Sequence, residues 1–268
     1  MLEDVDANLF ALSWLKNRGV EPHRGNAFSF WGFFDADSQL QGVALEVTGR
    51  LAMLDVRQEE LAADYGWFFG RQGIPFAHVV SRAEFVEPFW EEYSSETGSE
   101  ARLIQEQELY HLMPEDFSFP RRRQSAVRRA QMMEAESIFL ASVQMHREET
   151  LEDPLEEDAH AFRRHVRFRI EHGRTFAWFN ARRQLMFKAD ISTRCAEGAQ
   201  ISGVFTAPQF RNQGVATRAM TDICALLLQE ELPRLTLYVN QKNSSAIRVY
   251  ERIGFRQQGS YQTIFIDD

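Results

Sequence analysis

A short loop at residues 210–216 has the residue types of an anion-binding site. It follows an apolar strand pattern at 200–206, and it contains Gly214 just before a long helical pattern that starts at Val215. The first turn of a helix presents unpaired N–H groups at the positive end of the helix dipole, and both favour a phosphate group. Gly214 and Ala216 add little side-chain bulk, so phosphate oxygens can approach the backbone closely. The predicted phosphate contacts are Phe210, Arg211, Asn212, Gln213, Gly214, Val215 and Ala216.

Other types of ligand-binding motif fit this sequence less well. The sequence has no G-x-x-x-x-G-K-[ST] run, which argues against a P-loop nucleotide site, and no G-x-G-x-x-G run, which argues against a Rossmann dinucleotide site. The histidines lack ligand spacing, and Cys195 and Cys224 cannot form a paired motif, so we expect no metal site. For loop 210–216 the alternative is a tight strand-to-helix turn with a surface arginine.

A second motif follows this loop at the C-terminal side. Asn243 precedes a helical pattern, and Tyr250 is followed by Gly254 and Phe255. The R-x-x-G-x-A run of the loop and this Y-x-x-x-G-F run resemble the two signatures of the GNAT superfamily of acetyltransferases, over about residues 127–268. A narrower resemblance, to a bacterial group of two-part GNAT proteins, is carried by Met186-Phe-Lys-Ala-Asp190, Gly203-Val-Phe205, Leu237-Tyr-Val-Asn240 and Tyr261-Gln-Thr-Ile-Phe265.

The resemblance implies acetyl-coenzyme A (acetyl-CoA) as the cofactor and gives roles to residues beyond the loop. In GNAT domains the strand before the loop pairs with the pantetheine arm, which here implies the backbone of Val204 and Phe205. Asn243 matches an asparagine that commonly contacts the cofactor. Its structural alternative is to cap the helix expected to begin at Ser244.

Tyr250 matches the family tyrosine that often donates a proton to the coenzyme A thiolate. A phenol with a reference pKa of about 10 is protonated at neutral pH, whereas a thiol has a reference pKa of about 8.5, so this transfer is chemically reasonable. The alternative is a core aromatic, because Tyr250 shares helical spacing with Ile247 and Ile253.

Acetyl transfer to an amine also requires that the amine, with a reference pKa of about 10, lose a proton before it attacks. The acidic candidates for the base are Glu148 and Glu149, near the end of an expected helix, and Asp190 on an expected central strand. Among them we take Glu149 as the base. A chain of water molecules without a dedicated base is the alternative.

The periodicities predict an α/β (α+β) protein with a mixed, mostly antiparallel sheet flanked by helices. For the first half they predict strands at 28–34, 40–48, 51–56, 75–80 and 101–112, and helices at 59–70 and 81–93, with Ser81 as an N-cap. For the second half they predict helices at 131–148, 157–172, 215–231 and 244–253, and strands at 175–180, 184–193, 200–206, 235–240 and 261–266.

The similar order of elements in the two halves predicts two tandem GNAT-like domains. The segment 119–126 contains Pro120 and a run of arginines, and we take it as a linker. It separates a degenerate GNAT-like domain at 1–118 from a catalytic GNAT domain at 127–268. The first half lacks an R-x-x-G-x-G equivalent, so we expect that it does not bind acetyl-CoA in the usual way.

Composition limits the partners of the protein. The formal net charge of −9 argues against sequence-independent nucleic-acid binding, and no apolar run is long enough to span a membrane. The start of the sequence lacks the features of a signal peptide, and with two cysteines we expect a cytoplasmic protein. Exposed strand ends and aromatic-rich surfaces could support a homodimer.

The leading hypothesis is an acetyl-CoA-dependent N-acetyltransferase that acts on a primary amine of a small molecule or a peptide. The alternative from another class is a non-catalytic sensor that binds acyl-CoA and regulates a partner. A third hypothesis makes the first half a lid or specificity module for the acceptor. The sequence does not identify the acceptor, since one fold hosts many of them.

Overall fold

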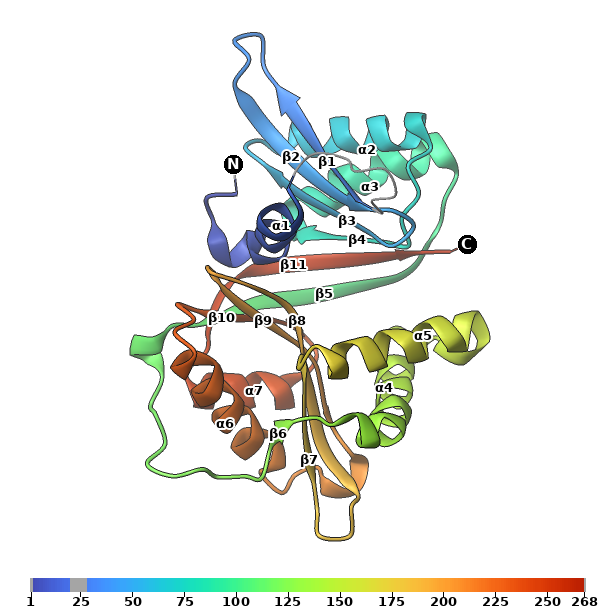
Figure 1. Cartoon of the computed structure of the whole chain (residues 1–268). Coiled ribbons are helices and arrows are strands. Elements are labelled where there is room, and N and C mark those ends of the chain that lie inside the picture. The colour runs from blue at the N-terminus through green and yellow to red at the C-terminus, as the bar shows by residue number, and fades with distance from the viewer. Residues whose placement is uncertain (1, 20–27, 268) are drawn as a thin grey trace. The chain divides into compact units, whose positions relative to one another are not determined.

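The computed structural model describes residues 2–19 and 28–267, and internal contacts divide it into two compact units (Figure 1). The first unit contains the N-terminal residues up to Tyr110, with Tyr238–Asn243 and the residues from Gln257 onward. The second unit contains His111–Leu237 and Ser244–Arg256. The end of the chain therefore groups by contacts with the N-terminal residues, whereas the sequence pattern assigned it to the second domain.

The first unit is a sheet with the strand order β1-β2-β3-β4-β11-β5. Neighbouring strands from β1 to β3 pair antiparallel, β3 and β4 pair parallel, and β4 and β11 pair antiparallel. The C-terminal strand β11 thus fills the position between β4 and β5. The elements are α1 (Val5–Arg18), β1 (Phe28–Phe34), β2 (Leu40–Val47), β3 (Leu51–Val56), α2 (Glu60–Gln72), β4 (His78–Arg82), α3 (Ala83–Thr97), β5 (Ala101–Leu112) and β11 (Arg256–Ile266).

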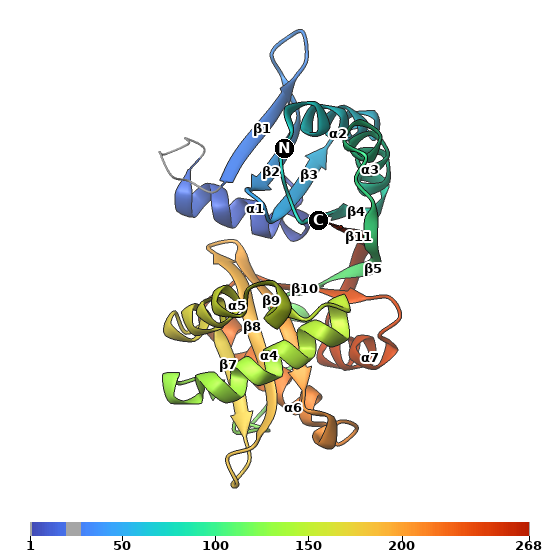
Figure 2. The ribbon, with the colours of Figure 1, turned by 90° about the vertical axis from the view of Figure 1, so that its right-hand side faces the viewer.

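The two faces of this sheet are covered by different helices. Side chains alternate along each strand, so Leu45 and Val47 of β2 pack with α1, whereas Ala44 packs in the cluster formed with α2 and α3. Figure 2 shows α2 and α3 side by side on their face. That face holds a dense aromatic core centred on Phe69 and Phe89, whose ring centroids are 5.7 Å apart.

Helices α2 and α3 approach each other through two glycines one turn apart. A Cβ atom on Gly66 would lie 2.1 Å from the backbone oxygen of Phe89, and one on Gly70 would lie 2.7 Å from Cβ of Glu96. Real Cβ atoms do not come so close to a backbone atom. The G-x-x-x-G spacing therefore sets the distance between the two helices.

The second unit contains a sheet covered by helices on both faces. Its strands run in the order β10-β9-β8-β7-β6, antiparallel except for the parallel pair β9–β10. Figures 1 and 2 show α4 and α5 on one face of β7–β9, and α6 and α7 on the other. The elements are β6 (Arg128–Arg129), α4 (Ala135–Thr150), α5 (Pro154–Glu171), β7 (Thr175–Phe179), β8 (Leu185–Cys195), β9 (Gly198–Thr206), α6 (Val215–Gln229), β10 (Leu235–Asn240) and α7 (Ser244–Ile253).

The predicted fold class, a mixed and mostly antiparallel sheet flanked by helices, is confirmed. The helix α1 was not predicted: it begins at Val5 after the N-cap Asp4, whose side chain accepts a hydrogen bond from the N–H of Ala7. Its polar and apolar residues are poorly segregated along the helix, so its periodicity is weak. Among the helices of the described residues, none is long and apolar enough to cross a membrane.

Two local predictions were wrong. Ser81 is not the N-cap of a helix, because it lies inside β4 and its hydroxyl donates a hydrogen bond to the carbonyl of Leu54 on β3. The helix predicted at 157–172 begins earlier, at Pro154 of α5, where a proline costs no hydrogen bond, and Asp158 marks a kink four residues later.

Candidate active site

Strand β9 has a bulge opposite β8. Lys188 pairs with Phe205 and Asp190 pairs with Ser202, so β9 contains one residue more than β8 between these pairs. The bulge includes Gly203, whose φ of 55° lies in the left-handed region that glycine adopts without strain. Such a bulge bends the strand and redirects its backbone N–H and C=O groups.

A side chain at position 203 would collide with a buried ion pair. A Cβ atom there would lie 2.7 Å from Oδ2 of Asp190 and 3.1 Å from Nζ of Lys188, with Cε of Met145 at 3.5 Å. The glycine is therefore required by conformation and by space.

Strands β9 and β10 pair over a short distance. Their parallel register joins Leu235 with Ala199 and Thr236 with Gln200, and β9 then continues to Thr206. The bulged half of β9 lies beyond this paired region.

The loop after β9 leads into α6, whose N-terminus has no side-chain cap. Asn212 and Gly214 have φ values of 60° and 70°, and Gly214 is the N-cap residue of α6 without any side-chain cap hydrogen bond. The first helical bond runs from the N–H of Arg218 to the carbonyl of Gly214. The N–H groups of Val215 and Ala216 precede it, at the positive end of the helix dipole. A Cβ atom on Gly214 would meet no atom within 4 Å, so the approach to these groups is open.

Side chains of the loop hold it in place. The guanidinium of Arg211 donates to the carbonyl of Thr206 at 2.9 Å and forms an ion pair with Glu148 of α4 at 2.8 Å. The Gln213 amide donates to the carbonyl of Gln209 at 2.9 Å. One of the two N–H groups of that amide is thus already used, and the backbone is the main donor for an anion.

Tyr250 of α7 is buried, with 5% of its surface exposed, and packs against Phe255. Within the described part of the chain, its hydroxyl has no hydrogen-bond partner. Burial raises the pKa of Tyr250, and the charges of Glu149 and Cys224 raise it further. Tyr250 is therefore a protonated phenol at neutral pH.

Glu149 lies near the C-terminal end of α4, one helical turn after Met145. Glu149 is an exposed residue, and desolvation of its carboxyl raises its pKa. Lys188 opposes this shift, and the neighbouring Glu148 adds to it. The roles of Glu149 of α4 and Tyr250 of α7 in proton transfer stay predictions.

Asp190, considered as a base from the sequence, has a different environment. Its Oδ2 accepts from Nζ of Lys188 at 2.7 Å and from Arg169 at 3.2 Å, and its Oδ1 accepts from the hydroxyl of Thr175 at 2.7 Å. Burial alone would raise the pKa of Asp190, but Lys188 and Arg169 hold it below its usual value. Asp190 is a buried counter-ion with both oxygens engaged, which makes it unsuitable as a base.

Sequence reasoning missed the partners of Asp190. The cluster formed by Lys188, Asp190, Arg169 and Thr175 joins β8 to α5 and β7. The available signal was the K-x-D spacing at 188–190 within an apolar strand, because two charges on one face of a buried strand must be paired.

The remaining predicted cofactor contacts are spread along the chain. Val204 lies in the bulged part of β9, and Phe205 is buried beneath the guanidinium of Arg211. Asn243 is exposed and directly precedes α7, and its N–H donates to the carbonyl of Asn240. Both readings of Asn243, cofactor contact and helix cap, stay predictions.

The first unit contains a similar strand arrangement without the features of a phosphate site. Strands β3 and β4 also pair parallel at two positions, Leu51 with His78 and Ala52 with Val79. The Ser81 hydroxyl then donates to a β3 carbonyl at 2.6 Å, which joins the strands beyond those pairs. The helix that follows β3 begins with the carboxylates Glu59 and Glu60, where an anion would be repelled.

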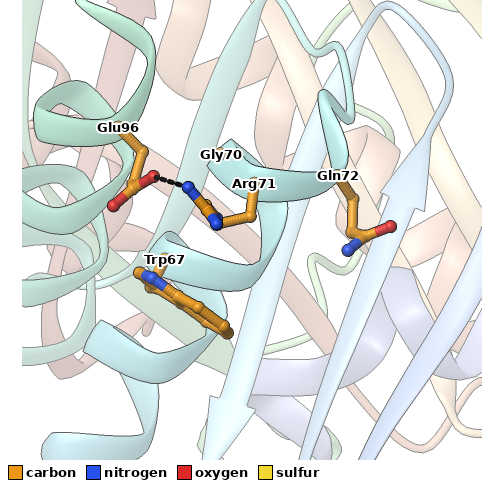
Figure 3. A pocket seen from close by; sticks show the side chains of 5 residues that line it. All are labelled: Trp67, Gly70, Arg71, Gln72 and Glu96. Atoms are coloured by element: carbon orange, nitrogen blue, oxygen red, sulfur yellow. Dashed lines mark ion pairs between the residues drawn. The ribbon is translucent and has the colours of Figure 1, made fainter.

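A surface hollow of about 500 Å³ lies over α2 and α3 in the first unit (Figure 3). Its lining includes the half-exposed ring of Trp67 and the ion pair of Arg71 with Glu96 at 3.7 Å. The hollow is open and belongs to neither the bulge nor the loop described above.

Comparison with known families agrees with this geometry. The profile of the acetyltransferase (GNAT) family matches residues 107–255, which is more than half of the chain. The chain belongs to the GNAT family. The match includes the bulged β9, the loop and Tyr250. A search of curated proteins gave no match.

Solved structures share this fold at low sequence identity. A Drosophila protein is 10% identical with a TM-score of 0.64, over 98% of this chain and 96% of that one. A GCN5-related N-acetyltransferase from Kribbella flavida is 15% identical with a TM-score of 0.59, over 98% and 96%. A tandem GNAT protein from the clavulanic acid biosynthesis pathway is 11% identical with a TM-score of 0.53, over 99% and 95%. These likenesses establish the fold.

Proposed function

We propose that the protein is an N-acetyltransferase that moves an acetyl group from acetyl-CoA to a primary amine of a small molecule or peptide. The observation that carries this proposal is the bulged strand β9 followed by the uncapped start of α6. Glu149 and Tyr250 are the groups that we assign to proton transfer. One group can accept a proton and the other can donate one. Acyl transfer to an amine needs both proton transfers.

Several residues fit acetyl-CoA. The open N–H groups at Val215 and Ala216 and the uncapped helix suit its pyrophosphate, and the left-handed Gly214 leaves room for it. The bulged backbone at Val204 and Phe205 suits the amides of the pantetheine arm. In the domain arrangement that we propose, this site lies in the catalytic region 127–268, and the region 1–118 does not bind the cofactor.

Bound acetyl-CoA supplies the acetyl group as an activated thioester. The chain's own groups handle the protons. An Oε atom of Glu149 accepts a proton from the acceptor ammonium, directly or through water. The hydroxyl of Tyr250 is protonated throughout the neutral range because its pKa is raised. It would give this proton to the departing sulfur while the acylated nitrogen loses its remaining extra proton, directly or through water, to the tyrosinate, so that the phenol is restored.

The test is release of coenzyme A, followed with a thiol-reactive dye, from acetyl-CoA and a panel of amines, amino acids and peptides. Tyr250→Phe and Glu149→Gln should each lower kcat by about 100-fold, the usual contribution of a positioned acid or base. Tyr93→Phe is the matched control, because it removes the hydroxyl of another buried tyrosine that lies in the first unit.

Two results would contradict the proposal. If Tyr250→Phe kept full activity under conditions in which chemistry limits the rate, the assigned acid would be wrong. If the protein bound acetyl-CoA but acetylated no amine of the panel, the acyl-CoA sensor would be the better description.

A further inference from the structure

Two stretches of the second unit contain cationic side chains and no carboxylate. Residues 174–189 cover β7, the hairpin that follows it and the start of β8, and residues 198–221 cover β9, loop 210–216 and the first turns of α6. Neither stretch contains an Asp or a Glu, although the whole chain has 39 of them and a formal net charge of −9. This part of an acidic protein is therefore basic, which suits an anionic ligand.

Arg218 is a cation that lies beside the proposed phosphate site. Its Nε donates to the carbonyl of Gly214 and its Nη2 donates to the carbonyl of Gln213, both at 3.3 Å. Helical side chains point back toward the N-terminus of their helix, so a residue one turn into α6 can reach these carbonyls. The carbonyl of Gly214 points along the helix, away from the N–H groups of Val215 and Ala216. The guanidinium therefore lies at the side of the first turn, next to those N–H groups but not over them.

An aromatic ring supports this guanidinium. Cζ of Arg218 lies 5.3 Å from the ring centroid of Trp178 on β7, which is a cation–π contact. Arg218 is exposed, and a guanidinium has five N–H donors. Within the described residues, two backbone carbonyls are the groups that accept hydrogen bonds from it. The ring and the carbonyls thus fix the position of the charge and leave donors for a ligand.

The charge of Arg218 has no carboxylate partner in the part of the chain that the structure describes. Arg211 of the loop, by contrast, forms an ion pair with Glu148 at 2.8 Å. The first turn of α6 also lacks an acidic residue. A cation at this end of a helix opposes the helix dipole and lowers the stability of the helix. An arginine that is held in such a place without an ion pair indicates that a bound anion supplies the missing charge.

The hairpin that follows Trp178 adds positive charge at the same end of β7. Arg182 and Arg183 are exposed, and among the described residues neither forms an ion pair. Asn180 orders the turn, because its side-chain oxygen accepts a hydrogen bond from the N–H of Arg182 at 2.9 Å. The turn therefore adds two cations to the basic surroundings of Trp178.

The chemistry of coenzyme A matches two neighbouring groups of donors. Coenzyme A has a pyrophosphate and, one ribose away from it, a 3′-phosphate. The pyrophosphate fits the backbone N–H groups at the start of α6, as proposed above. The 3′-phosphate needs a second group of donors close to the first, and the guanidinium of Arg218 has that place. Its planar N–H groups suit phosphate oxygens, and its charge is permanent.

We propose that Arg218, held on the ring of Trp178, binds the 3′-phosphate of coenzyme A, so that the protein selects coenzyme A over donors that lack this phosphate. This inference rests on the proposed function, because it assumes that the pyrophosphate lies at the start of α6. Arg218 is a binding residue in this account and takes no part in the proton transfers.

The experiment compares two ligands that differ only in the 3′-phosphate. Calorimetry of the full chain measures the Kd of coenzyme A and of 3′-dephospho-coenzyme A, neither of which carries an acetyl group to transfer. The wild type should bind coenzyme A about tenfold or more tightly than 3′-dephospho-coenzyme A, which is the effect of one hydrogen-bonded charge pair. Arg218→Met should weaken the binding of coenzyme A by the same factor and leave the affinity for 3′-dephospho-coenzyme A unchanged.

Arg167→Met is the matched control. Arg167 is also an exposed arginine without an ion pair in the described ranges, and it lies on α5, on the opposite face of the sheet (Figures 1 and 2). The control changes the net charge of the protein by the same amount as Arg218→Met. Both ligands should bind to it as they bind to the wild type.

Two results would overturn the inference and leave the proposed function intact. One is equal affinity of the wild type for the two ligands. The other is an equal loss of affinity for both ligands in Arg218→Met, because Arg218 would then act on the pyrophosphate or on the loop itself. If the wild type bound neither ligand, the cofactor assignment would fail, and the proposed function would fail with it.

Discussion

Two glycines of the candidate site should respond to alanine in different ways. Gly203 and Gly214 both have positive φ values, 55° and 70°. An alanine in this region costs about 1–2 kcal/mol at either position. At Gly203 the new Cβ would also lie 2.7 Å from Oδ2 of Asp190 inside a buried ion pair, whereas at Gly214 it would meet nothing within 4 Å.

The clash gives the expected difference in stability. Overpacking of a filled interior costs about 1–3 kcal/mol in addition to the backbone term. Gly203→Ala should therefore destabilise the second unit by about 2–5 kcal/mol in total, and Gly214→Ala by about 1–2 kcal/mol. For acetyl-CoA binding, Gly214→Ala should be the more harmful of the two variants, because it places a methyl group where phosphate oxygens are expected. The Kd of Gly214→Ala for acetyl-CoA should rise about tenfold or more, which corresponds to a loss of about 1.4 kcal/mol of binding free energy.

The assay is hydrogen exchange by mass spectrometry on peptides from β8 and β9, which reads the stability of this region separately from the first unit. Calorimetry with acetyl-CoA supplies the affinity. The reasoning would be refuted if Gly203→Ala and Gly214→Ala lost equal protection, since that would mean that the bulge has room for a side chain.

Three predictions concern the first unit. Burial lowers the pKa of His78 to about 4, and Arg50 adds to the effect. Below pH 6.5 the unfolded state therefore binds more protons than the folded state, and the free energy of unfolding falls by up to about 3 kcal/mol between pH 6.5 and 4. In urea unfolding, His78→Phe should show a weaker pH dependence of this free energy over the same range. Gly66→Ala should lower stability by about 3 kcal/mol or prevent folding, because its Cβ would meet the backbone of Phe89, and a normal melting temperature would contradict the close helix contact. Deletion of residues 256–268 removes β11 from between β4 and β5. The first unit should then lose protection against amide hydrogen exchange, although its N-terminal sequence is intact. Unchanged protection in β4 would show that β11 is dispensable.

The parts of the site that the sequence predicted are those encoded locally. The loop with Gly214 and the helix with Tyr250 each follow from residue types within a short segment, and their elements were predicted at nearly the observed boundaries. Glu149 was selected from its place at the end of a helix. Its position relative to Tyr250 depends on the packing of the elements in three dimensions, which no local pattern contains.

The parts that sequence missed depend on contacts between distant residues. The bulge at Gly203 follows from the register of β8 and β9, and a pattern of alternating residues does not reveal an extra residue. The burial of Lys188 depends on Asp190, Arg169 and Thr175, which three different elements supply. The insertion of β11 between β4 and β5 joins the two ends of the chain, and the linker-based boundary could not anticipate it.

The central claim is that the uncapped start of α6 binds the pyrophosphate of acetyl-CoA. The most direct measurement is calorimetric titration of the full chain with acetyl-CoA, using Gly214→Glu as the test variant and Gly73→Glu as the matched control. Gly73 of the first unit has a φ of 61° and, like Gly214, open space around its Cβ position. We predict one site per chain, lost in Gly214→Glu and kept in Gly73→Glu. Absence of binding to the wild type, or equal affinity in Gly214→Glu, would contradict the account.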